Sequence, residues 1–81
     1  MDEPTLEVKK QIIEARLVLW RNTLYAAMAD AKVAQNFIDA KIPSGETMLS
    51  QAKDEAKRCE VAITAYQQML DGILSNGATA D

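Results

Sequence analysis

Apolar residues in the second half of the chain recur at alternating spacings of three and four positions, from Leu49 to Ile73. The first half carries a matching row from Leu6 to Ile38, which only Lys10 interrupts. This spacing places the apolar side chains on one side of a helix and is typical of helices that pack along their length. The sequence therefore predicts an all-α fold with two long helices.

The stretch between the two rows contains the clearest break. Pro43 cannot continue the first helix and disfavours helical geometry at Ile42, and Ser44 is a good N-cap for the second helix. Such a short link makes the helices antiparallel neighbours, as in a coiled-coil-like helical hairpin. We expect one domain over 1–81, with a first helix over about 4–41, a turn over 42–45, a second helix over about 45–75 and a flexible tail over 77–81.

The expected helix ends carry recognisable signals. Asp2 or Thr5 can cap the first helix, and Asn76-Gly77 is suited to a left-handed stop after the second helix. Gly72 lies inside the last turns of the second helix and should weaken them.

The two apolar rows match in register. In an antiparallel hairpin, facing residues have position numbers with a nearly constant sum, and here the sum is 86 or 87 in eight consecutive layers. The predicted core layers are Ile13 with Ile73, Leu17 with Leu70, Trp20 with Tyr66, Leu24 with Ile63, Ala27 with Cys59, Ala31 with Ala56, Ala34 with Ala52, and Ile38 with Leu49. Because the small residues lie nearest the turn, we expect the hairpin to splay away from the turn, with Trp20 and Tyr66 filling the wider gap.

One flank of this core is a second apolar surface, which we name the interaction face. Its predicted residues are Ile12, Arg16, Leu19, Ala26, Val33, Phe37, Met48, Arg58, Ala62, Ala65 and Met69. Two helices alone cannot cover such a stripe, and an exposed stripe of this size marks a protein interface. We expect a second copy to cover it, giving a four-helix bundle dimer or a larger helical oligomer. The alternative is that another protein or a ligand covers it.

The two flanks also differ in charge. The other flank is predicted as a solvated face and carries Glu14, Arg21, Gln35, Lys53, Glu60 and Gln67. On the interaction face, Arg16, Asp30, Glu55 and Arg58 are expected to form an ion-pair cluster between chains that fixes register and orientation. The alternative is that the arginines bind an anion such as a phosphate or a carboxylate.

Composition limits how so short a chain can be stabilised. Its 81 residues include one cysteine and no histidine, so an intrachain disulfide is excluded and the commonest transition-metal ligand is missing. Cys59 occupies a position of the apolar row and is expected to be a core thiol. Regular helix packing and oligomerisation remain as the expected supports.

Charge and hydropathy narrow the partners and the compartment. Twelve acidic and nine basic residues give a net charge of −3, which argues against a nucleic-acid backbone binder. No apolar run approaches the roughly 20 residues of a membrane helix, and the N-terminus is acidic. We therefore expect a cytoplasmic protein without a membrane partner.

No arrangement of catalytic residues is recognisable. The chain lacks histidine, and its one cysteine lies in the apolar row, so no nucleophile–base pair is expected. No metal site and no cofactor are predicted. The favoured function is non-enzymatic protein binding by a small oligomeric hairpin, as an assembly factor, adaptor, chaperone-like factor or phage-encoded inhibitor of a host factor. The alternatives are a nucleotide binder or sponge, with pockets lined by Arg16, Arg21 or Arg58, and a Rop-like RNA-binding regulator.

Overall fold

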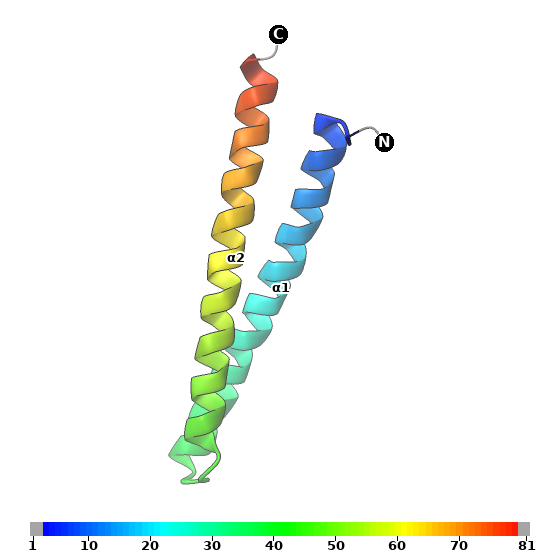
Figure 1. Cartoon of the computed structure of the whole chain (residues 1–81). Coiled ribbons are helices and arrows are strands. Elements are labelled where there is room, and N and C mark those ends of the chain that lie inside the picture. The colour runs from blue at the N-terminus through cyan, green and yellow to red at the C-terminus, as the bar shows by residue number, and fades with distance from the viewer. Residues whose placement is uncertain (1–2, 80–81) are drawn as a thin grey trace.

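The computed structural model describes residues 3–79 of the chain, with side-chain surroundings over 3–75. Helix α1 (Leu6–Asp39) and helix α2 (Gly45–Thr79) make up nearly all of this range. They pack side by side and run in opposite directions, joined by one tight turn (Figure 1). The described residues contain no β-strand, and the predicted all-α pair of packed helices is confirmed.

Helix α1 begins at a threonine cap. The hydroxyl of Thr5 accepts a hydrogen bond from the backbone N–H of Val8 at 3.2 Å, and Glu7 lies in the first turn. The cap satisfies one of the N–H groups that have no partner within the helix, and the acidic residue interacts favourably with the helix dipole. Thr5 is thus one of the two predicted caps, while Asp2 lies outside the described residues.

Helix α1 ends in a Schellman motif, a hydrogen-bonded C-terminal turn with one left-handed residue. The N–H of Lys41 donates to the carbonyl of Ile38, and the N–H of Ile42 donates to the carbonyl of Phe37, each at 2.9 Å. Lys41 occupies the left-handed position with a φ of 61°, which glycine usually fills. The expected helix over 4–41 is therefore shortened to Leu6–Asp39, because Thr5 and Lys41 take the non-helical conformations that cap it.

Gly45 is required where the chain turns back into α2. A Cβ atom at this position would lie 2.8 Å from the backbone nitrogen of Ile38 and 3.0 Å from the Cβ of Phe37. Only a residue without a side chain allows the start of α2 to approach the end of α1 so closely. The carbonyl of Ser44 accepts the first helical hydrogen bond, from the N–H of Met48 at 3.0 Å.

The C-terminal end of α2 differs from expectation. The predicted stop near residue 75 is corrected, because α2 continues through Asn76 and Gly77 to Thr79. Each of these two residues costs about 1 kcal/mol or less in a helix relative to alanine, so they weaken a helix without ending it. The predicted tail over 77–81 is thus helical up to Thr79, and residues 80–81 lie outside the described residues.

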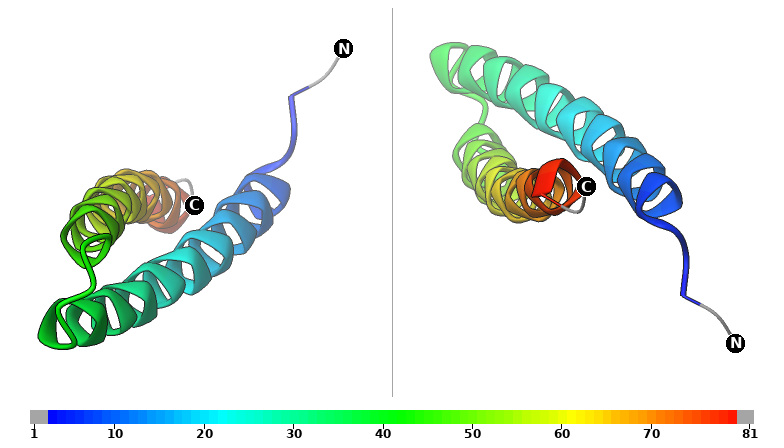
Figure 2. Two further views of the ribbon diagram at one scale, coloured as in Figure 1. Left: turned by 90° about the horizontal axis from the view of Figure 1, so that it is seen from below. Right: turned by 90° about the horizontal axis from the view of Figure 1, so that it is seen from above.

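The hairpin is long and tapered. Its extents are 61 × 24 × 14 Å, and its radius of gyration is 18.1 Å, compared with about 12 Å for a compact domain of this length. In the view of Figure 1 the helices diverge from the turn toward the two chain ends, and the views along the hairpin show that they also cross at an angle (Figure 2). The taper agrees with the alanine layers near the turn and the aromatic layer farther away.

Neither helix, within the residues that the structure describes, has a stretch long and apolar enough to cross a membrane.

Candidate interaction surface

The core between the helices is narrow. Within residues 3–75, seven residues are buried. One is Gly45 at the turn, and the other six belong to the predicted core: Leu17, Ala27, Ala34, Ala52, Cys59 and Leu70. The other predicted core residues are half-buried: Ile13, Trp20, Leu24, Ala31, Ile38, Leu49, Ala56, Ile63, Tyr66 and Ile73. A single pair of helices can shield only the middle of its contact line, so most of these apolar side chains keep one side open.

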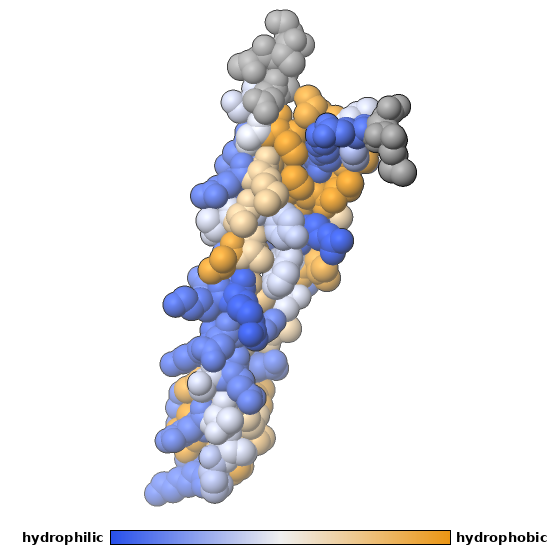
Figure 3. Space-filling model, in the orientation of Figure 1, coloured by the Kyte–Doolittle hydropathy of each residue, from blue (hydrophilic) through white to orange (hydrophobic). Residues whose placement is uncertain are grey.

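The exposed core edges and the interaction face together make an extensive apolar surface. Hydrophobic surface gathers over the open end of the hairpin, on α1 and on the adjoining part of α2, while polar surface covers the middle of α2 (Figure 3). Among the predicted residues of the interaction face, Leu19 is 53 % exposed, Val33 is 47 % exposed and Met69 is 53 % exposed. Side chains of this size are rarely left so accessible along a continuous row.

The remaining residues of the interaction face fall into two groups. Ile12, Arg16, Ala26 and Arg58 are exposed, whereas Phe37, Met48, Ala62 and Ala65 are half-buried. The half-buried group lies nearer the contact line between the helices and forms the inner edge of the face. The face therefore has an apolar floor with exposed apolar and basic side chains beside it.

Eight exposed large apolar residues within 3–75 lie outside the predicted interaction face, and four of them are the most exposed. Val18, Tyr25, Met28 and Val61 are between 55 % and 75 % exposed. Met28 lies seven residues from both Arg21 and Gln35, so it belongs to the flank that was predicted to be solvated. The heptad spacing placed Met28 in this row, but its polar neighbours Arg21 and Gln35 favoured the prediction of a solvated flank.

The solvated flank shows how the helices are aligned. The guanidinium of Arg21 donates from Nη2 to Oε1 of Gln67 at 3.2 Å, and Nε2 of Gln67 donates to a carboxylate oxygen of Asp71 at 3.1 Å. The first of these bonds joins α1 to α2. The position numbers of Arg21 and Gln67 add up to 88, close to the sum found for the core layers, so this hydrogen bond agrees with the predicted register.

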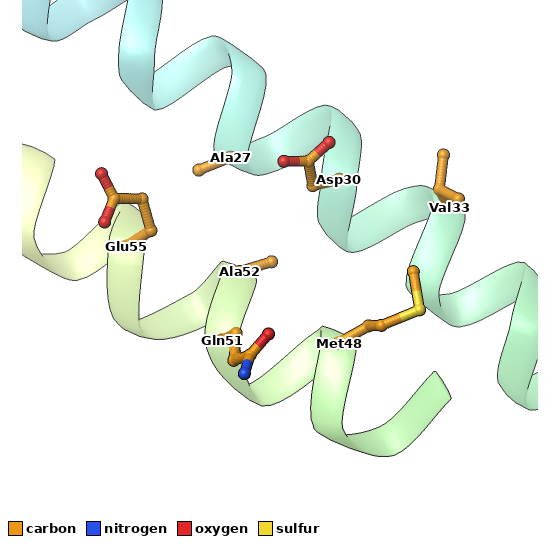
Figure 4. A pocket seen from close by; sticks show the side chains of 7 residues that line it. All are labelled: Ala27, Asp30, Val33, Met48, Gln51, Ala52 and Glu55. Carbon is orange, nitrogen blue, oxygen red and sulfur yellow. The ribbon is translucent and has the colours of Figure 1, made fainter. Parts of the chain in front are cut away.

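A groove of about 240 Å³ opens on the interaction face near the turn. Asp30 and Val33 border it from α1, Met48 and Glu55 border it from α2, and the small side chains of the close helix contact lie between them (Figure 4). Its full lining is Ala27, Asp30, Val33, Met48, Gln51, Ala52 and Glu55. The groove exists because alanine side chains leave space between two backbones whose flanks carry larger residues.

The groove combines apolar and acidic chemistry. Glu55 accepts a hydrogen bond from Nη2 of Arg58 at 2.6 Å and another from Nε at 3.2 Å. This hydrogen bond and the carboxylate charge raise the pKa of Arg58 above its ordinary value. The pair lies within one helix, and Asp30 adds a second carboxylate to the groove. Two acidic groups thus accompany one arginine there.

The structure does not gather the candidate anion-binding arginines into one place. Arg58 is paired with Glu55 beside the groove, and Arg21 is hydrogen-bonded to Gln67 on the opposite flank. Arg16 lies on the interaction face toward the open end of the hairpin, fourteen residues along α1 from Asp30. Asp30, Glu55 and Arg58 therefore lie together, and Arg16 lies apart from them.

Cys59 is fully enclosed between the helices, with an exposed fraction of 0 %. Burial is the main cause that raises the pKa of its thiol. A thiol that is both inaccessible and protonated is a poor nucleophile. Cys59 therefore packs as a small apolar residue in the layer that it shares with Ala27 in the predicted register.

No protein family, curated protein or solved structure shows significant similarity to this chain. The function is consequently inferred from the chemistry and geometry of the hairpin itself.

Proposed function

We propose that this chain is a non-enzymatic, cytoplasmic helical hairpin that acts by binding proteins through its interaction face. The first binding partner in this proposal is a second copy of the chain, and the resulting helical bundle then binds another protein. The candidate roles in this proposal are assembly factor, adaptor, chaperone-like factor and inhibitor of a host factor. The observation that carries the proposal is the exposed apolar row along α1, which includes Leu19 and Val33.

The isolated hairpin leaves several large apolar side chains partly in water. Ile12, Leu19, Val33 and Met69 are each about half exposed in the isolated hairpin. Covering a large aliphatic side chain completely contributes about 1.5–3 kcal/mol. Several half-exposed side chains in a row therefore provide a driving force comparable to that of ordinary protein interfaces, where a few apolar anchors carry most of the binding energy.

The test is the molecular mass of the protein in solution. Analytical ultracentrifugation of the wild-type chain should show a dimer or a larger oligomer. The variants Leu19→Asp and Val33→Asp should sediment as monomers, because each places a charge in the covered apolar surface. Val61→Asp is the matched control, since Val61 is 64 % exposed and lies outside the interaction face. A monomeric wild-type chain would disprove self-association.

The second protein partner needs a separate experiment. Affinity capture from the native host should recover a protein with the wild-type chain and with Val61→Asp, and should lose it with Leu19→Asp. A nucleotide that raises the melting temperature would instead favour ligand binding. Capture of RNA that weakens steeply with salt would favour the RNA-binding alternative.

A further inference from the structure

We infer that two copies of the hairpin pack antiparallel to each other, so that Arg16 and Met69 of each copy enter the groove between Asp30 and Glu55 of the other. This inference rests on the proposed self-association and adds the orientation and the contacting residues. Four observations support it: the area left exposed, the chemistry of the groove, the positions of the charges along the hairpin, and the taper.

The accessible surface of the single chain is larger than a monomer of its size should expose. It measures 6149 Å² for a mass of 8.9 kDa. A compact monomeric protein of this mass exposes about 4,800 Å². The excess of about 1,300 Å² is more than the roughly 800 Å² that each partner buries in a standard stable complex. A second copy of equal length would cover an area of this size.

The groove has the chemistry to receive Arg16 and Met69. Val33, Met48 and the alanine methyl groups offer apolar contacts, and the carboxylates of Asp30 and Glu55 offer hydrogen-bond acceptors. Arg16 and Met69 have position numbers that add up to 85, so they lie at nearly the same height on the two helices. A methionine is flexible enough to fill an irregular apolar gap, and an arginine beside it reaches the carboxylates with its long side chain.

The charges that would pair lack partners within one chain. Within residues 3–75, neither the side chain of Arg16 nor that of Asp30 has a hydrogen bond or an ion pair in the single hairpin. Glu55 is already paired with Arg58, so the groove keeps a net charge of about −1 at neutral pH. A guanidinium from a second copy would neutralise it.

Arg16 and Glu55 lie at equal distances along the hairpin from a part of the interaction face that carries small side chains. A residue of α1 and a residue of α2 whose position numbers add up to about 87 lie at the same height along the hairpin. Four small residues therefore lie close to the height of residue 24 of α1: Thr23, Ala26, Ala62 and Ala65. Arg16 lies eight residues from this height toward the open end, and Glu55 lies eight residues from it toward the turn. A two-fold axis through these small residues therefore brings each Arg16 beside the partner's Glu55, about 12 Å along the bundle from the axis.

The apolar ends and the taper match under the same axis. Phe37 lies thirteen residues from the axis on the turn side, and Ile12 lies twelve residues from it on the open side. The closely packed end of one hairpin would thus face the splayed end of the other (Figure 1). A parallel pair would instead place the two splayed ends together and bring Arg16 against Arg16, which is electrostatically unfavourable.

Crosslinking at two positions in one row of α1 tests the orientation. In the antiparallel dimer the two copies of residue 26 lie about 6 Å apart along the bundle, whereas the two copies of residue 33 lie about 27 Å apart. Ala26→Cys should therefore crosslink to itself with a short bis-maleimide, and Val33→Cys should not. Cys59 need not be replaced in these variants, because it is 0 % exposed and does not reach the reagent. The wild-type chain, which should not crosslink, is the control for this.

Charge reversal tests the proposed pairs independently. Arg16→Glu and Asp30→Arg should each raise the dimer dissociation constant about tenfold or more, because each creates two repulsive contacts. An equimolar mixture of the two variants should recover an affinity near that of wild type, since the heterodimer restores attraction at both sites. In a parallel dimer, Arg16→Glu would exchange one like-charge contact for another and change the affinity little.

The outcomes separate the two proposals. A wild-type dimer in which only Ala26→Cys crosslinks, with recovery on mixing, supports the antiparallel arrangement. A wild-type dimer in which both cysteine variants crosslink, or neither does, overturns this arrangement and leaves self-association intact. A monomeric wild-type chain overturns both.

Discussion

Lys41 holds the conformation on which the turn depends. Its φ of 61° places a side-chain-bearing residue in the left-handed region, where a Cβ atom costs about 1–2 kcal/mol relative to glycine. The two hydrogen bonds of the Schellman motif and the packing of α2 against α1 outweigh this cost. The sequence pattern did not reveal it, because a lysine before Ile-Pro gives no local sign of a left-handed residue.

Lys41→Gly should therefore stabilise the hairpin by about 1 kcal/mol, since glycine adopts the left-handed conformation without strain. Urea unfolding followed by circular dichroism measures this change. Lys41→Ala is the control, because alanine carries a Cβ atom but lacks the charge, and it should leave the free energy of unfolding nearly unchanged. An equal gain in both variants would show that the charge of Lys41, and not its conformation, is unfavourable.

Replacing Gly45 and Gly72 by alanine should change the free energy of unfolding in opposite directions. Gly45→Ala should destabilise the hairpin by about 1–3 kcal/mol, because the new methyl group would lie 2.8 Å from a backbone nitrogen that cannot move aside. Gly72→Ala should stabilise it by up to about 1 kcal/mol, because a Cβ atom there meets nothing within 4 Å. The measurement is the free energy of unfolding of each variant, and destabilisation by Gly72→Ala would contradict this assignment.

At the scale of the helices, side-chain size sets the spacing between α1 and α2. Layers of alanine and cysteine near the turn give fully buried positions such as Ala34 and Cys59, each with an exposed fraction of 0 %. In the wider part, Trp20 and Tyr66 remain half-buried. The taper of the hairpin thus follows from the order of small and large residues along both rows.

Trp20→Ala tests this contribution. Removing a partly buried tryptophan should cost about 3 kcal/mol, at the lower end of the range for large aromatic side chains in cores. Tyr25→Ala on the same helix is the control, because Tyr25 is 75 % exposed and its loss should change the stability by less than about 0.5 kcal/mol. Thermal unfolding that is the same for Trp20→Ala as for wild type would remove Trp20 from the contact between the helices.

The apolar periodicity predicted the two packed helices because a repeated spacing of three and four leaves few other structures. It also placed Arg21 and Gln67 on one flank, where they are hydrogen-bonded. It could not predict the exact helix ends, since Asn76 and Gly77 weaken a helix by little more than a kilocalorie and packing decides whether the helix continues. The periodicity also failed to predict the exposure of Met28 and Tyr25. Their exposure depends on how much of each helix surface the other helix can cover.

At the scale of the whole molecule, the unusual property is how little of the chain is enclosed. Only seven residues within 3–75 are buried, six with apolar side chains and Gly45, and none of them carries a polar or charged side chain. A domain of about 80 residues is marginally stable even when compact. A single elongated hairpin has less buried apolar area than such a domain, so its folding should be coupled to association.

Coupled folding and association predicts that thermal stability depends on protein concentration. For a dimer that unfolds to two chains, a tenfold increase in concentration should raise the melting temperature by about 4 °C, given a typical unfolding entropy per residue. Circular dichroism melts over a hundredfold concentration range measure this shift. Leu19→Asp should melt at a lower temperature that does not change with concentration, whereas Val61→Asp should keep the dependence of the wild type. A wild-type melting temperature independent of concentration would show that the open hairpin is stable alone, and its exposed apolar row would then serve another protein.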